Sequence, residues 1–89
     1  MPRVPSAAAA HIGEQIRAIR VGYSMTHDQL AARTGIDSSN IRSYESGRAM
    51  PSVHTLIRIA DALDTEPGRL LEGVTLEQFD GGVNGRRAG

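Results

Sequence analysis

Apolar residues recur at spacings of three and four along most of the chain, and no segment shows the regular apolar–polar alternation of a strand. The clearest stripe is formed by Ile12, Ile16 and Ile19, and Ala8 and Ala9 extend it towards the amino terminus. Residues at this spacing share one face of a helix, which is then buried against other helices. The sequence therefore predicts an all-α fold, and the breaks between stripes predict a compact domain of five helices.

The size and composition of the chain limit how such a domain is held together. It has 89 residues, which suits one small domain, and no cysteine, which excludes disulfides and thiolate metal clusters. It lacks a run of about 18 apolar residues that would span a membrane, and its opening MPRVPSAAAAHIGEQ does not read as a signal peptide. We therefore expect a soluble, cytoplasmic protein without membrane contact.

The overall charge is a weak guide to the partner. Ten arginines balance ten acidic residues, so the formal net charge is zero, which by itself argues against a partner as negative as DNA. The distribution is uneven, because residues 14–48 carry five arginines against four acids, whereas residues 49–72 carry two against four. The first half is the more basic one, which weakens the objection.

Capping residues mark where the helices begin and end. Thr26 and Gln29 have the spacing of a capping box, and Asp37 is a favourable N-cap. Gly35 and Gly47 suit the left-handed conformation that often ends a helix. The predicted helices are 7–22, 26–34, 38–46, a fourth that starts after the cap Ser52, and 67–72.

These helices place the folded domain at residues 7–72, with a flexible arm at 1–6 and a flexible tail at 73–89. In the fourth helix the row predicted to be buried is Leu56, Ile57, Ala60 and Leu63, widened by Ile59. The tail is rich in glycine, and we expect its last nine residues to be disordered. Its apolar residues leave two possibilities open, docking as a single turn or self-association; they are Val74, Leu76 and Phe79.

Two of the predicted helices, 26–34 and 38–46, are short and are joined by a tight turn. This is the layout of a helix-turn-helix, whose second helix can enter the DNA major groove, about 12 Å wide. At about 100° per residue, helix 38–46 turns Ile41, Tyr44 and Glu45 inwards. The residues that face outwards are Ser39, Arg42, Ser43 and Ser46. This helix is therefore the predicted recognition helix.

Several motifs occur in order along residues 12–71. They are IR at 19–20, MTHDQLA at 25–31, the turn at Gly35, YESG at 44–47 and PSVHTLIRIADALD at 51–64. Together they resemble the lambda-repressor-like, Cro/CI-type helix-turn-helix family, also called the xenobiotic-response-element family. In that family the second motif tends to read Leu-Thr-Gln-x-x-Leu-Ala and the fourth Ile-Glu-x-Gly. The resemblance implies a lambda-repressor-like, DNA-binding domain.

The resemblance also implies roles for individual residues. Arg20 and Glu45 are expected to form a structural salt bridge between the first helix and the recognition helix. The residues implied to contact DNA are Thr26, His27, Ser38, Ser39, Asn40, Arg42, Ser43 and Arg48. Within that set, base contacts are expected from Ser38, Ser39 and Ser43, with Asn40 and Arg42 at the flanks. Phosphate contacts are expected from Arg48 and from backbone amides near Thr26.

Two departures from the family pattern affect recognition. His27 stands where glutamine is usual, and because histidine can change charge near neutral pH, its phosphate contact would depend on pH. Serines replace longer base-reading residues, and a hydroxyl that both donates and accepts discriminates poorly between bases. We therefore expect Asn40, Arg42 and DNA shape to provide most of the specificity.

Other chemistries fit the sequence poorly. The three histidines are not at metal-ligand spacing; they are His11, His27 and His54. A hydrolase triad of Ser52, His54 and Asp61 is unsatisfactory, because Ser52 reads as a helix cap. Neither a nucleophile elbow nor a glycine-rich phosphate loop occurs. We expect no enzyme activity, no metal site and no cofactor.

Two functions remain open from the sequence. The leading hypothesis is a sequence-specific, double-stranded DNA-binding transcriptional regulator of bacterial or phage type, a repressor that binds an inverted repeat as a homodimer. It would be cytoplasmic and associated with the nucleoid when bound to DNA. The alternative is an antitoxin-like or adaptor module that binds a protein such as a toxin. The acidic balance of residues 49–72 and the apolar residues of the tail motivate this alternative.

Overall fold

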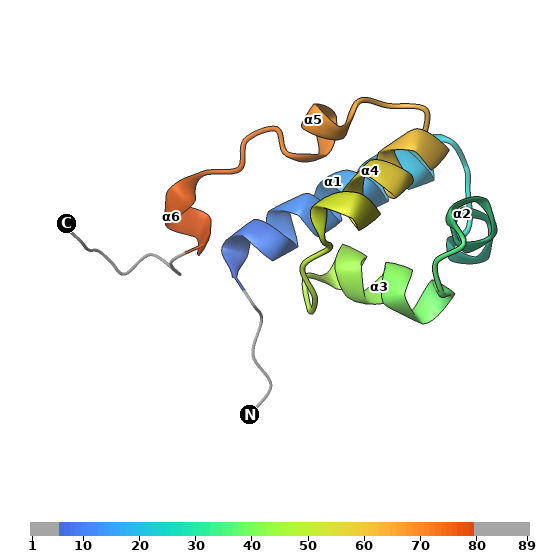
Figure 1. Cartoon of the computed structure of the whole chain (residues 1–89), viewed down its shortest axis with the longest axis horizontal. Coiled ribbons are helices and arrows are strands. Elements are labelled where there is room, and N and C mark those ends of the chain that lie inside the picture. The colour runs from blue at the N-terminus through green and yellow to red at the C-terminus, as the bar shows by residue number, and fades with distance from the viewer. Residues whose placement is uncertain (1–5, 80–89) are drawn as a thin grey trace.

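Six helices make up the described part of the chain. The structure, a computed structural model, describes residues 6–79, and all regular secondary structure within them is helical (Figure 1). The helices are α1 (Ala7–Gly22), α2 (His27–Thr34), α3 (Ser38–Ser46), α4 (Val53–Ala62), α5 (Pro67–Leu70) and α6 (Leu76–Phe79). The predicted all-α fold is confirmed, and the recognition helix α3 has the predicted bounds.

Side-chain caps start the first four helices. The hydroxyl of Ser6 accepts a hydrogen bond from the backbone N–H of Ala9 at 3.1 Å, so Ser6, expected in the flexible arm, caps α1. The caps expected for the next three helices also form; they are Thr26, Asp37 and Ser52. Gly35 and Gly47 follow α2 and α3 with φ of 75° and 82°, a conformation that glycine adopts without steric cost.

The segment after α5 forms a helix where the sequence predicts a flexible tail. Thr75 and Gln78 repeat the spacing of a capping box, and the backbone N–H of Thr75 donates to Oε1 of Gln78 at 3.0 Å. The resulting turn, α6, packs against α1, and Val74 packs against the core. Docking as a single turn is thus what the structure shows. The expectations for residues 1–5 and 80–89, disorder of the last nine included, lie outside the described residues.

The buried core draws side chains from α1 to α5. Its members are Ile12, Ile16, Leu30, Ile41, Leu56, Ile59, Ala60, Leu63 and Leu70. The row along α4 therefore follows the helical spacing i, i+3, i+4 and i+7 from Leu56 to Leu63. The prediction that Ile57 belongs to this row was wrong, because Ile57 is 48% exposed. It lies about 100° around the helix from Leu56, which turns it towards solvent.

α1 and α3 pack so closely that the contact requires glycine. A Cβ on Gly13 would lie 2.1 Å from the carbonyl oxygen of Tyr44 and 2.8 Å from that of Glu45. A Cβ on Gly47, just after α3, would lie 2.8 Å from Cα of Ala10. In Figure 1, α3 lies below the long helix α1. These backbone contacts set the distance between α1 and the recognition helix.

A buried ion pair joins the same two helices. Arg20 donates from Nε to Oε2 of Glu45 at 2.6 Å and from Nη2 to Oε1 at 3.0 Å. Its Nη1 donates to the carbonyl oxygen of Met25 at 2.6 Å, so the guanidinium also holds the turn between α1 and α2. The side chains of the pair are only 10% and 6% exposed. Such a bidentate pair fixes the orientation of both groups, and it is the pair that the family resemblance implies.

Replacing Gly13 by alanine should destabilise the domain, because the new Cβ forces α1 and α3 apart. Overpacking of this kind costs about 1–3 kcal/mol. Gly22 provides a matched control, since it ends the same helix and a Cβ there would meet nothing within 4 Å. Gly22→Ala should leave the free energy of unfolding unchanged or raise it by up to about 1 kcal/mol. Urea denaturation of both variants measures the difference, and equal losses would contradict the close packing.

Removing one partner of the ion pair should cost more than removing both. Glu45→Leu leaves the buried charge of Arg20 without its counterion, which should destabilise the fold by about 3–5 kcal/mol. Adding Arg20→Met removes that charge, so the double variant should recover part of the loss. Denaturation curves of the wild type, the two single variants and the double variant check this. Losses that simply add would mean that the two side chains are not coupled.

Candidate nucleic-acid interface

α2 and α3 form a helix-turn-helix unit whose turn is held by hydrogen bonds. The hydroxyl of Thr34 donates to the carbonyl oxygen of Leu30 at 2.9 Å and accepts from the backbone N–H of Ile36 at 3.1 Å. From α4, Nη2 of Arg58 donates to the carbonyl oxygen of Thr34. The positively charged guanidinium of Arg58 also interacts favourably with the negative, carboxyl-terminal end of the α2 dipole. The turn is thereby held from within and from α4, which fixes the direction in which α3 begins.

Sequence reasoning missed two residues that position α3. Gly13 carries a readable signal, because a glycine inside a helical stripe often marks a close backbone approach. Arg58 carries none, because its partner is a main-chain oxygen 24 residues away. Only the packing of α4 against α2 brings that pair together.

The amino terminus of α2 offers part of the expected phosphate contact. Oγ1 of Thr26 accepts from the N–H of Gln29 at 3.0 Å, and Oε1 of Gln29 accepts from the N–H of Thr26 at 2.8 Å. The amide of Thr26 is therefore already bonded within the chain. The next two amides, those of His27 and Asp28, begin the helix and have no intrahelical acceptor. They are the donors that a phosphate at this helix end would meet.

His27 lies beside the ion pair. Its Nε2 is 3.0 Å from Oε1 of Glu45, the oxygen that also accepts from Arg20, and its side chain is 30% exposed. The imidazole therefore links α2 to α3 through the same carboxylate. The contact of His27 with phosphate stays a prediction, and it would have to coexist with the contact to Glu45 or replace it.

The outer face of α3 carries most of the residues expected to touch DNA. Those exposed are Ser39, Asn40 and Arg42, together with Arg48 just beyond the helix, and those half-buried are Ser38 and Ser43. On the opposite side, Ile41 is fully buried and Tyr44 packs against the core. The expected Thr26 and His27 lie at the start of α2, which packs on α3. The structure thus places the whole set on the helix-turn-helix unit and its immediate flanks.

Asp37 holds the first turn of α3. Its Oδ1 accepts from the backbone N–H of Ser39 and from the hydroxyl of Ser39, each at 2.9 Å. These two hydrogen bonds hold the pKa of the Asp37 carboxyl below its usual value, and the bond from the backbone N–H of Ser39 has the larger effect. Because the folded state has the lower pKa, this cap stabilises the fold above the usual carboxyl pKa. The contribution is lost as the pH falls through the lowered value.

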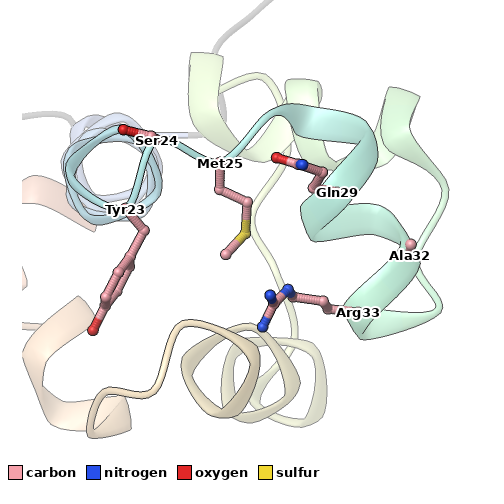
Figure 2. Close-up of a pocket in the computed structure, with 6 residues that line it drawn as sticks. All are labelled: Tyr23, Ser24, Met25, Gln29, Ala32 and Arg33. Carbon is pink, nitrogen blue, oxygen red and sulfur yellow. The ribbon is translucent and has the colours of Figure 1, made fainter.

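A shallow hollow of about 350 Å³ lies where α1 ends and α2 begins (Figure 2). Its lining residues are Tyr23, Ser24, Met25, Gln29, Ala32 and Arg33. The figure shows the side chains of Met25 and Arg33 directed into the space between these segments. None of the six belongs to the residues expected to contact DNA, and the side-chain oxygen of Gln29 is already bonded to Thr26. The hollow is therefore separate from the candidate interface.

The described residues form neither a cluster of metal ligands nor a membrane-spanning helix. Within residues 6–79, no three histidine, cysteine or acidic side chains gather as a metal ion requires. His11 instead places its Nε2 2.6 Å from the carbonyl oxygen of Glu72. None of the described helices is long and apolar enough to cross a membrane.

Comparison with other sequences relates the chain to transcriptional regulators. It is 39% identical over 56 residues to the HTH-type transcriptional regulator y4dL of Sinorhizobium fredii. The matched segment covers 63% of this chain and 29% of that protein. It is 36% identical over 53 residues to the cryptic phage CTXphi transcriptional repressor RstR of Vibrio cholerae, covering 60% of this chain and 47% of that protein. The chain therefore spans less than half the length of each of these two relatives.

Comparison with solved structures finds the same fold. The restriction-modification controller protein C.AhdI of Aeromonas hydrophila matches with a TM-score of 0.70 and 30% identity, over 72% of this chain and 97% of that chain. An HTH_3 family transcriptional regulator of Vibrio cholerae matches with a TM-score of 0.70 and 22% identity, over 75% of this chain and 38% of that chain. At 22% identity, the match to the Vibrio cholerae regulator indicates a shared fold only.

The family match covers the whole helix-turn-helix region rather than a single motif. The helix-turn-helix family HTH_3 matches residues 16–70, from the middle of α1 to the end of α5. This range exceeds half of the chain, contains the Arg20–Glu45 ion pair and nearly coincides with the resemblance at residues 12–71. The resemblance stated from the motifs is confirmed. The chain belongs to the HTH_3 family of helix-turn-helix proteins.

Proposed function

We propose that this chain is the DNA-binding domain of a transcriptional repressor that places α3 in the major groove of a specific operator. The observation that carries the proposal is the exposed polar face of α3, held rigidly on α1 by the Gly13 contact and the Arg20–Glu45 ion pair. A rigid helix of this kind fits the major groove, where side chains reach base edges. The relative that is named a transcriptional repressor supports repression rather than activation.

Two exposed arginines are suited to different roles on DNA. Arg42 lies within α3 among the polar residues that face outwards, so it would reach a base edge. Arg48 follows Gly47, beyond the helix, and its backbone N–H donates to the carbonyl oxygen of Ser43 at 3.0 Å. That bond holds the main chain of Arg48 at the end of α3 while its side chain stays exposed, which suits a phosphate contact.

The proposed complex contains two copies of the chain on an inverted repeat. With a formal net charge of zero, one copy would make few phosphate contacts, and pairing two half-sites raises affinity through effective concentration. A second copy could cover the large apolar side chains that remain exposed in and after α4; they are Val53, Ile57, Leu71, Leu76 and Phe79. Half-sites about 34–36 Å apart would match one turn of DNA.

The antitoxin-like or adaptor function stays a prediction, to which the comparisons add no support. Family membership confirms that the chain is not an enzyme, as the sequence predicts. Co-purification from the native host, with nuclease treatment to remove DNA, distinguishes the two functions. Under the proposed function no protein other than a second copy of the chain remains bound in stoichiometric amount after DNA is removed, whereas a partner module would retain a different protein.

Selection from a random duplex library at about 50 mM salt should enrich an inverted repeat, because electrostatic attraction is strongest at low salt. Sizing of the complex with the enriched duplex should give two chains per duplex. Enrichment of no motif would refute sequence-specific binding. Enrichment of a motif without symmetry, bound by one chain, would refute the dimer alone.

Alanine variants of the two arginines should weaken binding in different ways. Arg42→Ala should relax the preference at one operator position, losing about 1–3 kcal/mol of discrimination. Arg48→Ala should weaken specific and nonspecific duplexes alike and lower the salt slope by about one. Arg69→Ala, in α5, is the control and should bind as the wild type does, since Arg69 pairs with Glu72 instead. Identical effects of Arg42→Ala and Arg48→Ala on both kinds of duplex would contradict these roles.

A further inference from the structure

The hydroxyl of Ser39 has only one hydrogen to donate, and within the chain that hydrogen is already committed. Oγ of Ser39 lies 2.9 Å from Oδ1 of Asp37. An ionised carboxylate can only accept, so Ser39 must be the donor in this bond. The lowered pKa of Asp37 keeps that carboxylate ionised at neutral pH. What Ser39 still offers to an outside partner is its oxygen lone pairs.

The bond to Asp37 should survive contact with DNA. Hydrogen bonds to an ionised group are about twice as strong as bonds between neutral groups. A neutral base acceptor that took the hydroxyl proton would replace a stronger bond with a weaker one. The backbone N–H of Ser39 donates to the same Asp37 oxygen at 2.9 Å, which keeps the two residues in register.

The other exposed serine of α3, Ser46, has a different hydrogen-bond acceptor. Ser46 also donates its hydroxyl hydrogen, but to the backbone carbonyl of Ser43 at 3.1 Å, at the far end of the helix. Ser39 instead lies in the first turn, which enters the major groove first in a helix-turn-helix complex. Ser39 is therefore the serine whose direction of hydrogen bonding is set by a charged residue where the bases are read.

The major groove displays acceptors and donors in a pattern that such an oxygen can distinguish. Adenine N6 and cytosine N4 carry amino hydrogens there, whereas thymine O4, guanine O6 and guanine N7 only accept. A serine free to rotate would tolerate either kind of edge. An acceptor-only serine forms a bond with an amino group and faces an oxygen or N7 acceptor without one.

We propose that Ser39 is a specificity-determining residue that acts only as an acceptor and selects adenine or cytosine over thymine or guanine at one operator position. This inference rests on the proposed placement of α3 in the major groove. Asp37 is the positioning residue, because it acts on DNA through Ser39.

The first step of the test is selection from a random duplex library with the full chain, its Ser39→Ala variant and its Ser46→Ala variant. The wild type should enrich adenine or cytosine at one position of each half-site. Ser39→Ala should lose the preference at that position alone, and Ser46→Ala should keep the wild-type motif. Circular dichroism confirms that each variant is folded.

The second step removes the amino group itself from the operator. Purine in place of adenine, or 2-pyrimidinone in place of cytosine, should weaken wild-type binding about three- to tenfold, the value of one net hydrogen bond. Ser39→Ala should bind both duplexes equally, because its bond is already absent. Ser39→Thr, which keeps the hydroxyl, should restore the sensitivity to the amino group.

Two outcomes would overturn the inference while leaving the proposed function intact. One is an enriched operator whose sequence Ser39→Ala leaves unchanged. The other is a Ser39-dependent position that prefers thymine or guanine, since the hydroxyl would then be donating. If the wild type enriches no motif at all, the proposed function fails together with this inference.

Discussion

The recognition helix depends on one buried carboxylate. Glu45 accepts from Arg20 in bidentate geometry and lies 3.0 Å from the imidazole of His27, so α1, α2 and α3 meet at this side chain. Arg20 extends the connection to the turn before α2 through the carbonyl oxygen of Met25. A charge buried this deeply is tolerated only because its donors are in place. These contacts orient α3 from its buried side. Its exposed face can therefore consist largely of short polar side chains.

The two exposed serines of α3 differ in the group that accepts their hydroxyl hydrogen. Ser39 donates its hydroxyl hydrogen to the carboxylate of Asp37, and Ser46 donates its hydroxyl hydrogen to a main-chain carbonyl oxygen. A hydroxyl that is free to rotate can donate to one base and accept from another, so it discriminates poorly between them. A hydroxyl whose hydrogen is already donated to a neighbouring group can only accept, and it can therefore discriminate. Asn40 and Arg42 are both exposed, and we propose that they supply the longer reach. Under the proposed function, specificity would be divided between long side chains and one short side chain whose hydrogen bonding is oriented by Asp37.

Local signals predicted much of the fold, and contacts made through space account for the rest. The bounds of α3 follow from Asp37 and Gly47, which act on adjacent residues, so the sequence predicts them well. The Gly13 contact, the bond from Arg58 to Thr34 and the placement of His27 beside Glu45 depend on how helices pack, which periodicity does not specify. α6 and the bond from Ser39 to Asp37 are also local; the sequence left docking of the tail as a single turn open beside self-association, and it did not predict the bond from Ser39.

The most direct test of the account is an amide NMR titration of the chain with its enriched operator duplex. If α3 lies in the major groove and α2 meets a phosphate, the largest shift changes should fall at residues 26–28 and 37–48. Amides of α5 and α6 that face away from any second copy should change little. Large changes confined to α4, α5 and α6, with those of α3 unaffected, would contradict the account.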